Sequence, residues 1–194
     1  EVPGPVHIDL AAPSQVQATP ESQPLSPPLA SDVALPAEVR RPAVIVGSLA
    51  TRRGWVEALA ALKIPVFTAA SAKGIIDERS PFSAGVFTGV GGELAPERTV
   101  LYEADMVIGI GLRNTEVIAA NPLPAGSLLI DQVDGGLSGG FDARTVLAKD
   151  EAVLGALREL LKHQWGAGEI ARSLESLREE LSTGWLPGDC FDAF

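Results

Sequence analysis

The chain has 194 residues, with 15 lysines and arginines against 25 aspartates and glutamates, which gives a formal net charge of −10. The sequence pI of about 4.6 excludes the basic surface that nucleic-acid binding needs and makes an anionic membrane a poor partner. Hydrophobic residues at 46% and charged residues at 21% exclude a disordered chain and predict one core of ordinary size. No apolar run approaches the roughly 20 residues of a membrane helix.

The first 35 residues are predicted to be a short strand followed by an extended linker. Residues 6–10 alternate in polarity after a Pro-Gly-Pro turn, as in a strand. Prolines then crowd residues 11–35, where each removes a backbone donor and fixes φ, so a helix is disfavoured. Since the chain opens at Glu1 with no initiator methionine and no signal peptide, we expect it to be a piece of a longer protein.

Residues 36–166 are predicted to form an α/β domain. Apolar runs of the kind found in buried parallel strands occur at residues 42–47, 64–68, 105–111, 127–131 and 145–147. Apolar residues at helical spacing predict helices over 55–62 and 150–165. Residues 71–98 are rich in glycine, serine and proline, which favours a long loop with room for one short helix. The alternation predicts a three-layer, doubly wound, mostly parallel sheet of five to six strands of the nucleotide-binding type.

Residues 167–194 are predicted to be an amphipathic helix followed by a tail. Ile170, Leu174, Leu177 and Leu181 form one apolar stripe, and charged side chains occupy the other face. After Gly184 the sequence is typical of turns.

Glycines that follow the predicted strands are candidates for ligand binding. Gly109 and Gly111 satisfy the first two positions of the dinucleotide fingerprint G-x-G-x-x-G, with Asn114 at the third. Gly47 ends the first strand of the domain, and residues 85–92 contain four further glycines. From the residues alone, these glycines either let backbone N–H groups approach a phosphate or only permit tight turns.

For two charged residues, Arg113 and Asp131, the sequence likewise allows either a ligand-binding or a purely structural role. Arg113 either pairs with a phosphate or forms a salt bridge to Asp131 or Asp134. Asp131 either accepts a hydrogen bond from a ribose or an adenine amine, or caps the turn that follows it.

Groups suited to catalysis are scarce. His7 and His163 lack partner motifs, and the single cysteine, Cys190, excludes an internal disulfide and a multi-cysteine zinc site. No G-x-S-x-G, H-E-x-x-H or P-loop sequence occurs. We therefore predict no catalytic residue and no metal ligand in this chain. The cysteine usage favours a cytoplasmic location.

Several short stretches, which follow one another between Gly4 and about Trp185, are informative when taken together. They are residues 4–10 (GPVHIDL), 41–47 (RPAVIVG), 64–68 (IPVFT), Lys73-Gly74, Glu78, Ser80-Pro81, Gly85, 105–108 (DMVI) with Gly111 and Arg113, Ile130-Asp131, and Lys149-Asp150. Together they resemble the central region of thiamine-diphosphate-dependent enzymes, the group that contains acetolactate synthases and 2-oxo-acid decarboxylases.

The resemblance implies a non-catalytic scaffold. In this family the central domain has a nucleotide-binding-like fold, while thiamine diphosphate is held by a glutamate of the N-terminal domain and by a GDG…Asn magnesium motif of the C-terminal domain. Residues 188–190 (GDC) lack the third glycine of that motif. We thus expect residues 1–35 to be the last strand of a missing N-terminal domain plus a linker, 36–166 the central domain, and 167–194 a helix and linker toward a missing C-terminal domain.

Some family members hold FAD or an ADP group in this domain. By resemblance, the cofactor-binding positions are Gly47, Gly85, Gly89, Gly111, Arg113 and Asp131. We do not favour retained FAD, because Ser48 and Leu49 stand where FAD-binding members have two further glycines. In addition, Val133 replaces the second aspartate of the family's "IDID" strand.

The sequence thus predicts a scaffold domain from a lyase or transferase that acts on C–C bonds next to a carbonyl. Thiamine diphosphate and Mg²⁺ would serve the parent without being bound by this segment. Its partners would be the missing flanking domains, within a homo-oligomer. The alternative is a module that still binds FAD or an ADP-containing ligand. A sirtuin-like NAD-dependent enzyme would need a pocket histidine and a zinc-binding cysteine cluster, which this sequence does not supply.

Overall fold

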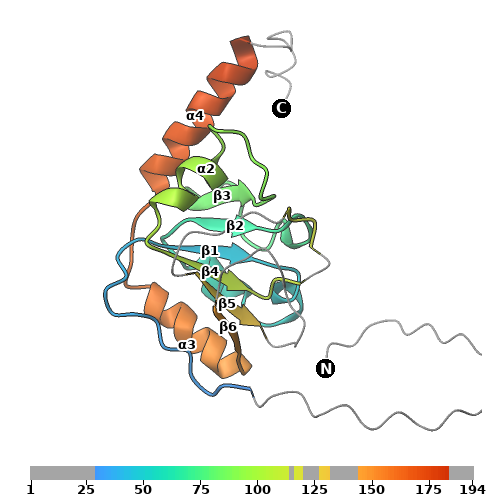
Figure 1. Cartoon of the computed structure of the whole chain (residues 1–194), viewed down its shortest axis with the longest axis vertical. Helices are drawn as coiled ribbons and strands as arrows, with labels where there is room; N and C mark the ends of the chain where they lie inside the picture. The colour runs from blue at the N-terminus through green and yellow to red at the C-terminus, as the bar shows by residue number, and fades with distance from the viewer. Residues whose placement is uncertain (1–28, 114–115, 120–126, 132–143, 184–194) are drawn as a thin grey trace, which may run out of the picture.

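The protein forms a parallel six-stranded sheet with helices on both faces (Figure 1). The structure, a computed structural model, describes residues 29–113, 116–119, 127–131 and 144–183. The strands within these ranges are β1 (Pro42–Val46), β2 (Val66–Thr68), β3 (Ser83–Val86), β4 (Met106–Ile110), β5 (Leu128–Asp131) and β6 (Arg144–Leu147). The predicted doubly wound α/β fold is confirmed, whereas the strand expected at residues 6–10 lies outside the described residues.

The strand order is β3-β2-β1-β4-β5-β6, and every pairing is parallel. β1 lies near the centre and is buried along its whole length. Its side chains alternate between the two faces, because Val44 and Val46 belong to one hydrophobic cluster and Ala43 and Ile45 to the other. This two-sided burial explains the unbroken apolar run that predicted the strand.

β3 was not expected, because residues 71–98 were predicted to be a long loop. The strand has only four residues, lies at the edge of the sheet and buries only Ala84 among them. Gly85 has a φ of 86°. Between Val66 and Thr68 of β2, the register on β3 advances from Ser83 to Val86, which marks a β-bulge. A short edge strand with a glycine bulge lacks the apolar periodicity that sequence analysis detects.

Helices cover the two faces of the sheet separately. Over the described residues these are η1 (Ala50–Arg52), α1 (Val56–Ala60), η2 (Ala70–Ala72), α2 (Pro96–Thr99), η3 (Leu101–Glu103), α3 (Asp150–Leu160) and α4 (Ala167–Thr183). α1 and α3 pack on one face through Leu59 and Leu157. α2, η3 and the start of α4 pack on the other through Leu101 and Ile170. Within the described part of the chain, no helix is long and apolar enough to cross a membrane.

The described end of the predicted linker touches the domain. Ala30 donates its N–H to the carbonyl of Leu147 at 2.7 Å and accepts from the N–H of Lys149 at 2.9 Å, next to the end of β6. Val33 is 5% exposed in the core. Residues 29–35 are therefore extended, as expected, and contribute to the sheet edge and the core. The domain boundary at residue 35 stays a prediction.

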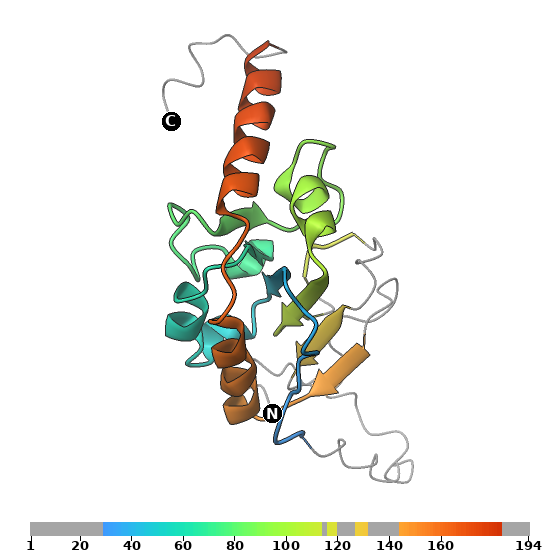
Figure 2. The same cartoon turned by 90° about the vertical axis from the view of Figure 1, so that its left-hand side faces the viewer.

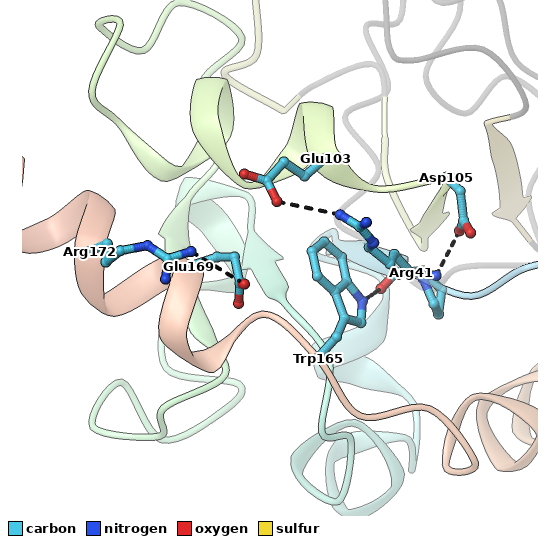
Figure 3. Close-up of polar contacts among 7 residues, drawn as sticks. Arg41, Glu103, Asp105, Trp165, Glu169 and Arg172 are labelled. Carbon is cyan, nitrogen blue, oxygen red and sulfur yellow. Dashed lines mark hydrogen bonds and ion pairs between the residues drawn. The ribbon is translucent and has the colours of Figure 1, made fainter.

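The connection from α3 to α4 crosses the amino-terminal edge of the sheet. α3 ends at Leu160, five residues before the predicted end at Trp165. It ends there because residues 163–165 leave the helix and bond to backbone near the beginning of β1 and β2. The N–H of Trp165 donates to the carbonyl of Lys63 at 3.0 Å, and its indole Nε1–H donates to the carbonyl of Pro42 at 2.7 Å (Figure 3). Trp165 packs against both hydrophobic clusters. This crossing moves the chain from one face of the sheet to the other.

The same edge carries an aspartate that joins β1 to β4. The carboxylate of Asp105 accepts hydrogen bonds from the N–H groups of Arg40 at 2.7 Å and Arg41 at 2.9 Å. The Arg41 guanidinium also lies 3.6 Å from the Glu103 carboxylate, with both side chains about half exposed (Figure 3). An exposed pair of this kind contributes little to stability, so the contacts of Asp105 matter more here.

We predict that Trp165→Phe lowers the free energy of unfolding by about 1–2 kcal/mol, because it keeps most of the ring packing and removes the hydrogen bond to Pro42. Urea denaturation followed by circular dichroism measures the change. Tyr102→Phe is the matched control, since Tyr102 is 50% exposed and its hydroxyl meets only Arg98 at 3.3 Å among the contacts described. Equal midpoints for the two variants would show that the Trp165 indole does not stabilise the crossing.

Candidate functional site

Most of the predicted ligand-binding residues lie at the carboxyl ends of neighbouring strands. Gly47 follows β1, Gly111 follows β4 with the half-buried Arg113 two residues later, and Asp131 ends β5. The strand order reverses direction between β1 and β4, so these residues surround the switch point where doubly wound sheets bind ligands. The backbone of Asp131 pairs with Leu147 of β6, and the side chain of Asp131 lies outside the described atoms.

Gly47 and Gly111 are in direct backbone contact. A Cβ added to Gly47 would lie 2.3 Å from the carbonyl oxygen of Gly111, so only glycine fits there. The N–H of Gly47 donates to the carbonyl of Ile110 at 2.8 Å, and the N–H of Gly111 donates to the carbonyl of Ile130 at 3.0 Å. Leu49 in turn donates its N–H to the Gly111 carbonyl at 3.1 Å. The loops after β1 and β4 are thus bonded to each other across the switch point.

Gly89 is held in a similar way by protein atoms. Its N–H donates to a carboxylate oxygen of Glu97 at 3.2 Å. A Cβ added there would lie 2.4 Å from the carbonyl oxygen of Ala119. The N–H of Ala119 donates to the Thr88 carbonyl at 2.8 Å. The structure therefore ties the loop after β3 to the segment that follows β4.

Gly85 lies apart from the other predicted residues. It forms the bulge of β3 and lines a pocket of about 310 Å³ together with Lys73, Glu78 and Leu174, none of which is among the switch-point residues. The Lys73 ammonium lies 3.7 Å from the Glu78 carboxylate, and both side chains are more than half exposed. In this structure the positive φ of Gly85 serves the bulge.

Two buried carboxylates were not predicted from the sequence. Glu97 is 5% exposed and Glu116 is 8% exposed. An oxygen of Glu116 accepts the Ser48 N–H at 2.8 Å, and the other oxygen accepts the hydroxyl of Ser71 in a short contact. Their partners lie far away in the sequence or in irregular loops, so no local motif marks either residue.

Three of the described backbone donors around the switch point are not free to bind the diphosphate of FAD or ADP. Such a ligand needs unpaired backbone donors, whereas the N–H groups of Gly47, Gly111 and Ser48 donate to other atoms of the protein. The carboxylate of Glu116 would also repel a phosphate placed beside Ser48. The assignment of the six predicted positions to a ligand stays a prediction.

A Mg²⁺ site is likewise not assembled by the described residues. Over these ranges, no group of three or more His, Cys, Asp or Glu side chains is placed to hold a metal ion.

A family model described as the central domain of thiamine pyrophosphate enzymes matches residues 33–130, just over half of the 194 residues. The chain belongs to this family. The match begins at the buried Val33 and ends in β5, so it includes β1 to β4 and the switch point. The resemblance expected from the sequence is therefore confirmed.

Solved structures of related fold were also found. One is an X-ray structure of a protein from Mycobacterium smegmatis proposed to be a thiamin diphosphate-dependent enzyme, with 19% identity, a TM-score of 0.49, and coverage of 63% of this chain and 25% of that one. Another is benzoylformate decarboxylase from Polynucleobacter necessarius, with 21% identity, a TM-score of 0.46, and coverage of 66% and 25%. The aligned part of this chain spans about a quarter of the length of each protein. No curated protein sequence matches it significantly.

Proposed function

We propose that this chain is a non-catalytic scaffold domain of a thiamine-diphosphate-dependent enzyme that cleaves or forms a C–C bond next to a carbonyl. The observation that carries the proposal is the family match over residues 33–130. Its partners would be the other domains of the same enzyme, within a homo-oligomer in the cytoplasm. Substrates would be 2-oxo acids, in the manner of acetolactate synthases or decarboxylases.

The described contacts support a structural role. Among the described residues at the switch point, the N–H groups of Gly47 and Gly111 donate to carbonyls of neighbouring strands and that of Ser48 donates to Glu116, so these three donors are satisfied within the protein. The amino edge is fixed by Asp105 and Trp165. Because hydrogen bonds connect the strands at both their amino and their carboxyl ends, such a domain can hold its neighbouring domains at a constant separation. The same internal pairing is the reason why we do not propose the nucleotide-binding alternative.

Thiamine diphosphate supplies an ylid that adds to a carbonyl and stabilises the carbanion that results. In the proposed enzyme, the residues that bind and activate it would belong to the flanking domains. The contribution of this chain would be positional, because a small displacement of catalytic groups lowers the rate strongly.

The complete coding sequence and an activity assay test this proposal. We expect the reading frame to continue on both sides, with a glutamate-bearing domain upstream and a GDG…Asn motif downstream. The complete protein should turn over a 2-oxo acid with thiamine diphosphate and Mg²⁺. The 194-residue chain alone should show no turnover under the same conditions, measured by substrate loss and CO₂ release.

Turnover by the 194-residue chain itself, dependent on added thiamine diphosphate, would overturn the scaffold role. A reading frame without those two motifs would overturn the proposed parent enzyme. Reactions without the cofactor provide the background rate for both proteins.

A further inference from the structure

Glu116 occupies a central position among the loops at the carboxyl edge of the sheet. It follows β4, while its two hydrogen-bond donors, Ser48 and Ser71, follow β1 and β2 respectively. One carboxylate therefore connects the loops after three adjacent strands. At 8% exposure, Glu116 is among the few charged side chains of the described residues that are buried.

The donors that Glu116 uses are of the kind that bind phosphate in nucleotide-binding sheets. In a doubly wound sheet of this strand order, the loop after β1 presents backbone N–H groups to the pyrophosphate at the switch point. Here the N–H of Ser48, the residue directly after Gly47, points to the Glu116 carboxylate at 2.8 Å. The Ser71 hydroxyl adds a second donor from a neighbouring loop. A carboxylate and a phosphate share the features that matter here, which are negative charge and acceptor oxygens.

We propose that Glu116 is a built-in anion that takes the place of a ligand phosphate and holds the loops after β1, β2 and β4 together without a nucleotide. The Gly47–Gly111 contact supports this arrangement, because it brings the two central loops close enough for one side chain to bridge them. A buried carboxylate satisfied by protein donors excludes a second anion from the same position. The loops after these strands thereby keep the arrangement that they have in a nucleotide-binding sheet, while the Glu116 carboxylate excludes a diphosphate from the position next to Ser48.

Removal of the carboxylate tests the proposal by chemical rescue. Glu116→Ala deletes the atoms of one acetate unit and leaves Ser48 and Ser71 without their acceptor. We expect its unfolding equilibrium constant in chloride buffer to rise by about tenfold or more. Sodium acetate at constant ionic strength should reverse at least half of the resulting shift in the urea midpoint, because acetate fits the vacated volume and restores the acceptor. The wild-type midpoint should rise in acetate only by the small non-specific amount that this salt gives any folded protein.

Glu116→Gln is the matched control, because the amide keeps the shape and leaves no space for acetate. Its midpoint should respond to acetate no more than the wild-type midpoint does. Sodium pyrophosphate serves as the probe for a ligand phosphate and should raise the midpoint of the wild-type protein no more than sodium sulfate does at the same ionic strength.

Three results would overturn the proposal. The first is a Glu116→Ala midpoint equal to that of the wild type, and the second is a destabilised Glu116→Ala that acetate stabilises no more than it stabilises Glu116→Gln. The third is a rise of the wild-type midpoint with pyrophosphate that exceeds the rise with sodium sulfate at the same ionic strength.

Discussion

Replacement of Gly47 by alanine is expected to destabilise the protein by about 3 kcal/mol or more. The added Cβ would lie 2.3 Å from the Gly111 carbonyl oxygen and 2.5 Å from the Leu112 Cα. Both are backbone atoms in the loop after β4, so no side chain can rotate away to relieve the clash. The loops after β1 and β4 would have to separate, which breaks the hydrogen bond from Leu49 to Gly111. Urea denaturation followed by circular dichroism measures the loss.

The matched control for this variant is Gly54→Ala. Gly54 is exposed and a Cβ there would meet no atom within 4 Å, so we expect a change within about 0.5 kcal/mol. Because small domains are stable by only about 5–15 kcal/mol, Gly47→Ala also ought to reduce the yield of soluble protein. A Gly47→Ala variant with the midpoint of Gly54→Ala would show that the two loops are not in contact in solution.

Replacement of Glu97 by alanine is expected to have the second large effect, with a loss of about 3 kcal/mol. Glu97 accepts the Thr88 N–H at 2.7 Å, the Thr88 hydroxyl at 2.8 Å and the Gly89 N–H at 3.2 Å. Alanine would remove the Glu97 carboxylate that accepts these three hydrogen bonds. The loop after β3 would then lose three of its hydrogen bonds to α2 and keep the one from Arg98 to the Gly91 carbonyl. Thermal unfolding and hydrogen exchange at the Thr88 and Gly89 amides report the change.

Glu97→Gln separates hydrogen bonding from charge at this position. A glutamine oxygen can accept both N–H groups, and its amide can donate to the Thr88 hydroxyl oxygen, so we expect a loss of only about 1 kcal/mol. The exposed Glu93 provides the control through Glu93→Ala, which should leave stability unchanged. Equal losses for the alanine and glutamine variants would contradict the role of these hydrogen bonds and assign the effect to charge.

The sequence predicted those strands whose burial on both faces produces a continuous run of apolar residues. β1 and β4 are buried on both faces, and their apolar runs predicted each end of both strands to within one residue. The amphipathic pattern of α4 likewise gave its position. β3 gave no such signal, because its small residues and its bulge at Gly85 bury little surface. The end of α3 was misplaced because a long-range contact with Lys63, and not local propensity, determines it.

The site was predictable only in part, for a related reason. A glycine after a buried strand is visible in the sequence, so Gly47 and Gly111 were found and do lie together. The state of their N–H groups depends on residues elsewhere in the chain. Glu116 lies 68 residues from Ser48 and 45 from Ser71, and a single sequence contains no signal that pairs residues at such distances. The sequence therefore indicated where the carboxyl ends of the central strands meet. It did not indicate that other atoms of the protein already accept hydrogen bonds from the N–H groups of Gly47, Ser48 and Gly111.

The attachment of Trp165 has a mechanical consequence for α4. This helix begins two residues after a side chain bonded to the first residue of β1, and it extends beyond the sheet (Figure 2). Ser173 fixes its first half by donating to the Leu94 carbonyl at 2.6 Å. A pulling force on the far end of the helix would therefore be shared between β1, which is bonded to Trp165, and the segment between β3 and α2, which is bonded to Ser173.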